Sequence, residues 1–159
     1  APNPWYYEMP EIGFNYRITD VQCALGTSQL KKLDRFLTRR RELALRYDSI
    51  LAEIPHVTPT QRAGRSNSAH HLYEVRIDFE AARRSRASFM RELIARNIIC
   101  QVHYIPVHYH PYYRANGHRQ DRFPVAEQYY EQALSLPLYY ELSDEDQDTV
   151  VAQIKRLVA

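Results

Sequence analysis

The chain has 159 residues, with 21 Lys and Arg against 19 Asp and Glu, and a net charge of +2. This near-balance gives no case for nucleic acid or an anionic membrane as a partner, and a chain of this length can bury one domain core. Cys23 and Cys100 lack the spacing of a disulfide framework or a zinc site, which favours a reduced, cytoplasmic protein.

The start of the chain, APNPWYYEMP, predicts neither a signal peptide nor a membrane anchor. It has no basic segment followed by an apolar one, and no apolar run in the chain approaches the roughly 20 residues of a membrane span. Because no initiating Met is present and the entry is rich in Pro and aromatic residues, we expect a larger protein to continue upstream.

Residues 19–54 are expected to form two helices or one kinked helix. Thr19 or Asp20 can cap the first, on whose apolar stripe we expect Cys23 to be a small core residue. Asp34 can restart the helix, and apolar residues then recur at helical spacing as far as Ile54. We therefore expect an entry segment and helical arm over 1–55, and an α+β domain over 56–159.

Strand and helix patterns alternate in the second part of the chain. Residues 60–68, TQRAGRSNS, indicate a polar loop, and 71–79, HLYEVRIDF, alternate like a half-buried strand. Ser85 can cap a helix that ends near Asn97, after which 98–105, IICQVHYI, predict a second strand. Pro106 and Pro111 make continuation as a central strand improbable.

The last third predicts two helices around a short extended piece. Pro124 suits a first helical turn, LSLPLY is extended, and Ser143 followed by three acidic residues marks another helix start. The sum is an α+β fold: a short antiparallel sheet with helices packed on one face, preceded by a helical arm.

The stretch QVHYIPVHYHPYYR, residues 101–114, allows three interpretations. Three histidines could bind a metal, but no acid or Cys completes the set. The tyrosines with Arg114 could stack on nucleic-acid bases, although aromatic residues between prolines more often pack a loop. In an extended segment Gln101 and His103 point one way and Val102 and Tyr104 the other, which suits the lining of a pocket.

Two arginine runs, 39–41 and 83–86, are most simply solvated helix faces, with an anionic partner as the alternative. Trp5, at the start of the chain, is expected to have a packing or surface role.

Segments 13–51, 71–79, 85–113 and 123–151 together resemble the C-terminal part of the DegT-type nucleotide-sugar aminotransferases. These are enzymes of fold type I that use pyridoxal 5'-phosphate (PLP). Within the family, NYR followed by QVHYIP resembles the members that aminate C4 of a UDP-linked 4-keto-6-deoxy-N-acetylhexosamine in pseudaminic acid biosynthesis. The resemblance implies a fold-type I small domain without the large domain, which supplies the Schiff-base lysine, the acid facing the pyridinium nitrogen and most of the phosphate cup.

No lysine here stands in the family's Ser-x-His-Lys setting. Lys31, Lys32 and Lys155 lie in helical patterns, so the isolated chain is expected to be inactive and to contribute no catalytic residue. PLP is expected in the full enzyme and not on this chain alone.

The resemblance also implies which residues meet the cofactor and the substrate. Asn15 and Arg17 would reach across a homodimer to the partner's PLP phosphate and sugar, with Phe14 and Tyr16 packed inward. A substrate wall would be formed by Gln101, Val102, His103 and Tyr104, and glutamate is the expected amino donor. The alternatives are a sister aminotransferase for another nucleotide keto sugar, or a non-catalytic dimerisation or binding module of the same fold.

Overall fold

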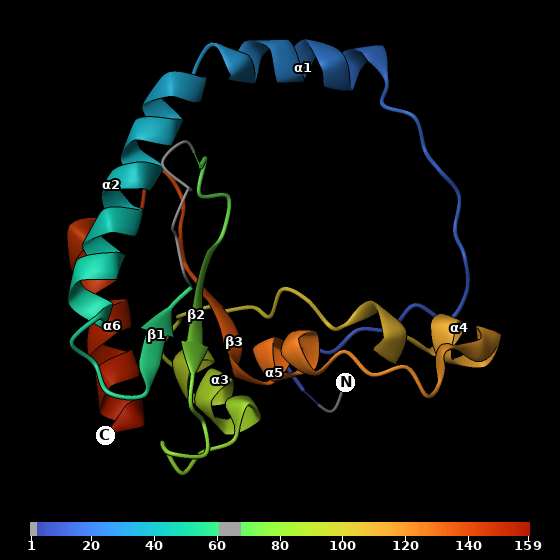
Figure 1. The fold of residues 1–159 in the computed structure, drawn as a ribbon. Helices are drawn as coiled ribbons and strands as arrows, with labels where there is room; N and C mark the ends of the chain where they lie inside the picture. The colour runs from blue at the N-terminus through green and yellow to red at the C-terminus, as the bar shows by residue number, and fades with distance from the viewer. Residues whose placement is uncertain (1–2, 61–67) are drawn as a thin grey trace.

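A computed structural model describes residues 3–60 and 68–159, so most of the predicted loop at 60–68 lies outside the described residues. The elements are α1 (Asp20–Leu30), α2 (Leu33–Leu51), β1 (Val57–Pro59), β2 (Tyr73–Ile77), α3 (Arg86–Ile94), η1 (Val107–Tyr109), α4 (Pro111–Tyr113), η2 (Arg114–His118), α5 (Pro124–Gln132), β3 (Ala133–Leu136) and α6 (Asp144–Val158). The strands pair antiparallel in the order β1–β2–β3, which confirms the predicted α+β class (Figure 1).

The arm is a pair of helices, as predicted, but its first helix is not packed. Thr19 and Gln22 form a capping box, in which the Gln22 amide donates to Thr19 Oγ1 at 3.4 Å and the Thr19 amide donates to Gln22 Oε1 at 2.8 Å. No residue of α1 is buried, and Figure 1 shows this helix standing away from the sheet. The expectation that Cys23 belongs to a core is wrong, because Cys23 is exposed and no described element buries any residue of α1.

The sheet explains the alternation in 71–79. Tyr73, Val75 and Ile77 are fully buried, whereas Arg76 between them is exposed. The short edge strand β1 was not predicted; it pairs Val57 with Ile77 and ends at Pro59, where a proline is tolerated.

The second predicted strand, 98–105, is wrong. Only one antiparallel bridge, between Gln101 and Ser135, joins this segment to β3. The chain then leaves the sheet edge and enters the turn at Pro106, so no further ladder bonds form.

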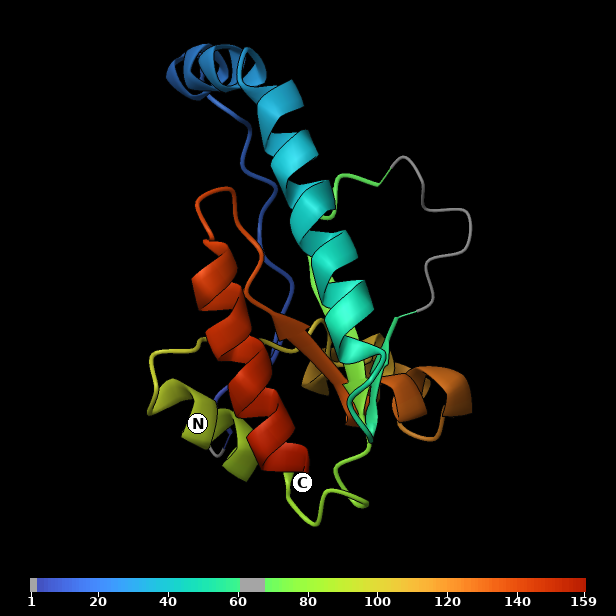
Figure 2. The ribbon, with the colours of Figure 1, turned by 90° about the vertical axis from the view of Figure 1, so that its left-hand side faces the viewer.

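The core lies between the sheet and its helices. Figures 1 and 2 show α2 and α6 side by side over one face of the sheet. The cap of α6 is the predicted one, since Ser143 Oγ accepts from the Asp146 amide at 3.0 Å, and the apolar face of this helix is buried. α3 begins after the predicted cap Ser85 and adds Phe89 and Leu93, while Asn97 adopts a left-handed φ of 59° just beyond its end.

Neither arginine run is simply solvated, which corrects that expectation. Arg39 bonds the Leu142 carbonyl and Asp144 Oδ1, both at 2.8 Å, and Arg40 bonds the His70 carbonyl at 2.9 Å. These contacts tie α2 to the start of α6 and to the segment before β2.

In the second run, Arg86 is buried against the N-terminal segment. Its guanidinium lies 4.3 Å from the ring centroid of Trp5 and 4.5 Å from that of Tyr130, and it donates to the backbone carbonyls of Tyr130 and Ala133. Trp5 Nε1 donates to the Tyr130 hydroxyl at 3.1 Å. The N-terminal segment is therefore held against the domain, because the guanidinium of Arg86 lies between the rings of Trp5 and Tyr130.

Candidate functional site

The predicted wall, Gln101–Tyr104, lies beside β3 at the edge of the sheet. Gln101 and Ser135 exchange two backbone hydrogen bonds, of 3.2 and 2.7 Å. Val102 is buried in the core, whereas Gln101 and Tyr104 are exposed. The Val102 side chain therefore faces away from any ligand on the open side, and contact from this residue is limited to its backbone.

His103 is the most constrained polar residue of the wall. Its Nδ1 lies 2.8 Å from Oγ of the buried Ser135, a neighbour that the sequence does not indicate. Burial lowers the pKa of His103, although the nearby Glu74 carboxylate opposes this effect and His71 adds to it. Burial therefore favours the neutral imidazole, and one of its ring nitrogens is engaged by Ser135.

Asn15 and Arg17 are not brought to this wall within one chain. Both are exposed, and in Figure 1 the stretch just before α1 loops away from the rest of the chain. Phe14 and Tyr16 are 88% and 86% exposed, so the expectation that they pack inward is wrong for this chain. Four neighbouring residues thus present two apolar and two polar side chains outward.

The other two histidines of 101–114 do not converge with His103. His108 is buried and its Nε2 lies 2.9 Å from Glu127 Oε1, while the ring of His110 lies 5.7 Å from that of Tyr7. The pKa of Glu127 is lowered, first by the Phe123 amide and then by His108. Across residues 3–60 and 68–159, no three His, Cys, Asp or Glu side chains form a group suited to a metal ion.

The tyrosines of this stretch pack against rings within the chain. Tyr112 and Tyr113 meet edge to face at 5.3 Å, and Tyr109 meets Tyr130 in the same manner at 6.2 Å. Such contacts favour the packed-loop interpretation over a platform for bases. In the described part of the chain, no helix is long and apolar enough to cross a membrane.

The lysines lie at or near the surface, and one cysteine is buried. Lys31 and Lys155 are exposed, and Lys32 lies half-buried at the junction of α1 and α2. Cys100 is buried, and burial raises the pKa of its thiol to about 12, so no reactive thiolate forms near neutral pH.

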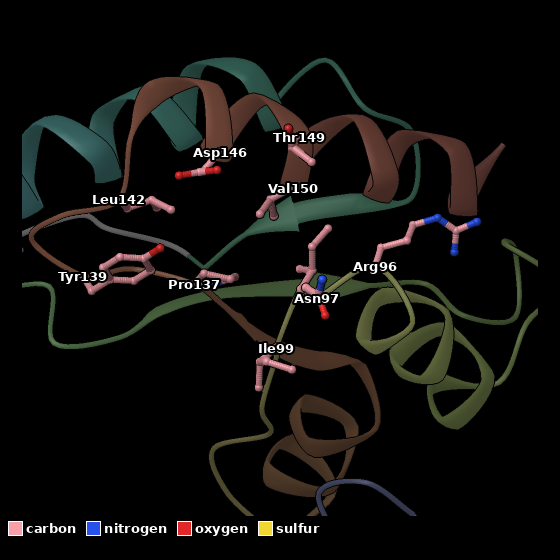
Figure 3. A pocket seen from close by; sticks show the side chains of 10 residues that line it. Arg96, Asn97, Ile99, Pro137, Tyr139, Leu142, Asp146, Thr149 and Val150 are labelled. Carbon is pink, nitrogen blue, oxygen red and sulfur yellow. The ribbon is translucent and has the colours of Figure 1, made fainter.

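A cavity of about 520 Å³ lies on another part of the domain, between the end of α3 and α6. Figure 3 shows Arg96, Asp146 and Tyr139 around it, with Ile99 and Val150 as apolar lining. None of the residues predicted to bind cofactor or substrate lines this cavity, so it does not enlarge the candidate site.

The three-stranded sheet, the covering helices and the projecting arm define the small C-terminal domain of a fold-type I aminotransferase. The chain belongs to the DegT/DnrJ/EryC1/StrS aminotransferase family, which it matches over residues 2–155.

Three curated relatives are similar over most of this chain. Protein MJ1066 of Methanocaldococcus jannaschii is 38% identical over 98% of this chain and 40% of its own length. The spore coat polysaccharide biosynthesis protein SpsC of Bacillus subtilis is 39% identical over 97% and 40%. A UDP-4-amino-4,6-dideoxy-N-acetyl-beta-L-altrosamine transaminase of Campylobacter jejuni is 32% identical over 89% and 37%. The chain thus spans about two fifths of the length of these relatives.

Solved structures agree with this assignment. Helicobacter pylori PseC, an aminotransferase involved in the biosynthesis of pseudoaminic acid, superimposes with a TM-score of 0.80 at 30% identity, over 94% of this chain and 40% of that one. The PLP form of Spr1654 from Streptococcus pneumoniae superimposes with a TM-score of 0.78 at 28% identity, over 97% of this chain and 39% of that one.

Proposed function

We propose that this chain is the C-terminal small domain of a PLP-dependent aminotransferase that acts on a nucleotide-linked keto sugar. One observation carries the proposal: within a family match over nearly the whole chain, Ser135 holds His103 on the open side of the 101–104 wall. The substrate we infer is a UDP-linked 4-keto-6-deoxy-N-acetylhexosamine, aminated at C4 with glutamate as the donor. The similarity to the Campylobacter transaminase and to PseC supports this finer choice.

The residues present fit only one edge of a PLP site. When bound, this cofactor supplies the electron sink through which an amino group moves between substrates. No lysine of the chain lies in a shielded site, so the cofactor-binding lysine would come from the part of the relatives' length that this chain does not span. Arg17 can offer a fork of donors to a phosphate, and Asn15 both a donor and an acceptor to a sugar.

The wall would orient the sugar nucleotide through neutral donors and acceptors. With Nδ1 of His103 engaged by Ser135, Nε2 remains available to a ligand hydroxyl or phosphate oxygen. The Gln101 side-chain oxygen accepts from the Val102 amide at 3.0 Å, which leaves its NH₂ group to donate. The exposed Tyr104 ring can pack against the sugar.

The arm supports a homodimer in which each chain completes the other's site. Its outward apolar side chains have nothing to cover them within the described chain: Ile12, Phe14, Tyr16, Ile18, Val21, Leu25 and Leu30. A second copy that buries this surface would also receive Asn15 and Arg17. A non-catalytic dimerisation module would use the same surface, and a sister aminotransferase would differ only in its keto sugar.

The test uses the full-length protein of which we propose this chain is a part. Loaded with PLP and supplied with glutamate, it should convert the UDP-linked 4-keto sugar into an amino sugar, detected by mass spectrometry. His103→Ala should weaken binding of the sugar nucleotide by roughly tenfold, the effect of one or two hydrogen bonds. His110→Ala is the matched control and should leave the affinity unchanged, and EDTA should have no effect.

Three outcomes would contradict this proposal or change the substrate that it assigns. Turnover of a different keto sugar would favour the sister enzyme. A dimer without turnover of any keto sugar would favour the non-catalytic module. Equal losses in the His103 and His110 variants, together with inhibition by EDTA, would instead indicate a metal site.

A further inference from the structure

The sheet face opposite the α2 and α6 core carries a row of polar side chains. Ser135 on β3 is paired with Glu74 on β2 and, at its other edge, with Gln101. Thr60 continues the β1–β2 pairing, since its amide donates to the Glu74 carbonyl at 3.1 Å. Side chains at directly paired positions project to the same face, so Thr60, Glu74, Ser135 and Gln101 form one row across the sheet.

The predicted substrate wall is one end of this row. His103 reaches the row through its 2.8 Å contact with Ser135 Oγ. Glu74 lies close enough to His103 for its charge to act on the imidazole. The polar surface on which the 101–104 segment lies therefore extends along the row to Glu74 and Thr60.

Two atoms of the row lack partners among the described residues. Glu74 Oε2 and Thr60 Oγ1 are removed from solvent and make no hydrogen bond. A buried polar group without a partner is costly, and an ionised carboxylate can only accept. Glu74 forms no ion pair with a described basic residue, so its buried Oε2 has no donor among the described residues. The terminal torsion of a glutamate is broad, which lets either oxygen turn toward the open side.

We infer that Glu74 contacts the sugar of the bound nucleotide, accepting a hydrogen bond from a hydroxyl or from the N-acetyl amide N–H. This inference rests on the function proposed above. A carboxylate repels a diphosphate, so Glu74 contributes to binding of the sugar and not of the nucleotide part. Thr60, which can donate and accept, lies beside it and suits a neighbouring hydroxyl.

The experiment compares two ligands in the full-length, PLP-loaded protein. UDP-N-acetylglucosamine carries the hydroxyls and the N-acetyl amide of the sugar, whereas UDP lacks the sugar altogether. Glu74→Ala should lower the affinity for UDP-N-acetylglucosamine about tenfold and leave that for UDP unchanged, as expected for one charge-assisted hydrogen bond. Arg76→Ala is the matched control, since Arg76 is exposed on the same strand and face; it should change neither affinity.

Glu74→Gln separates binding from folding. Because Oε2 has no partner among residues 3–60 and 68–159, removing the charge of Glu74 should leave the melting temperature unchanged or raised, while the sugar-dependent part of the affinity falls. A lower melting temperature with both affinities intact would overturn the inference and assign Glu74 a partner within the protein. Equal losses for the two ligands would also overturn it.

The wild-type protein distinguishes this inference from the function on which it rests. If the wild type binds UDP-N-acetylglucosamine and the Glu74 variants bind it equally well, the inference alone fails. If the folded, PLP-loaded wild type binds neither nucleotide, the proposed function fails and the inference fails with it.

Discussion

Replacing Arg86 with alanine should release the N-terminal segment from the domain. The guanidinium is held between the rings of Trp5 and Tyr130 and donates to two backbone carbonyls. Hydrogen bonds from a charged donor contribute about 1.5–3 kcal/mol each, and a cation–π contact about 0.5–2 kcal/mol. Burial of the charge offsets part of this sum, as the lowered pKa of Arg86 indicates.

We therefore expect Arg86→Ala to lower the free energy of unfolding by about 3 kcal/mol, in the range for loss of a buried charged partner. Arg86→Met keeps an apolar stem between the rings and should cost about half as much. Arg86→Lys keeps the charge but not the planar fork, so it should not restore full stability.

Urea unfolding followed by fluorescence measures these differences directly, because Trp5 is the one tryptophan of the chain. Its emission should shift to the red in Arg86→Ala before the domain unfolds, while far-ultraviolet circular dichroism stays native. An Arg86→Ala variant within about 0.5 kcal/mol of wild type, with unchanged Trp5 emission, would refute the reasoning.

Three further experiments test the exposure of the cysteines, the pKa of His103 and the cap of α6. Iodoacetamide should alkylate the exposed Cys23 in the native chain at once but Cys100 only after denaturation, since Cys100 is buried and its pKa is about 12. The intact mass of the protein would give the number of adducts. The pKa of His103 in the folded chain is depressed below its ordinary 6.5, so the unfolded chain binds a proton at His103 more readily than the folded one. The free energy of unfolding should therefore fall as the pH drops through and below 6.5. In urea titrations at several pH values, His103→Gln should reduce this dependence of stability on pH. Ser143→Ala should cost about 1 kcal/mol in thermal unfolding, because it removes the cap of α6, whereas Ser143→Asp should retain most of the stability.

Elements with strong local signals were predictable from the sequence. α6 combines a capping serine, three acidic residues in its first turn and an apolar stripe, all between Ser143 and Val158. The strand at 73–77 followed from strict alternation, and the α1–α2 break from a second possible start near Asp34. Each of these signals lies within one element and needs no knowledge of its neighbours.

Features that depend on distant segments were not predictable. Trp5, Arg86 and Tyr130 meet although 125 positions separate the first from the last, and no periodicity marks such a set. The alternation of 101–104 correctly separated the buried Val102 from Gln101 and His103, but it wrongly placed the exposed Tyr104 on the same side as Val102. It also gave no sign of the contact of His103 with Ser135. Glu74 was visible only as the polar side of a strand, because its place beside Ser135 follows from sheet register.

The uncovered helix α1 bears on how tightly the arm can associate. An isolated helix of 11 residues is marginal in water, so α1 depends on its capping box and not on packing. Whatever surface receives the arm must then supply the free energy that orders it. In the homodimer proposed above, Thr19→Ala, which weakens the helix by about 1 kcal/mol, should raise the dissociation constant of the dimer about fivefold, because the Thr19 hydroxyl caps its own helix through Gln22. A substitution at a helix cap can thus change the affinity of the arm for the surface that receives it, although every side chain in contact with that surface stays the same.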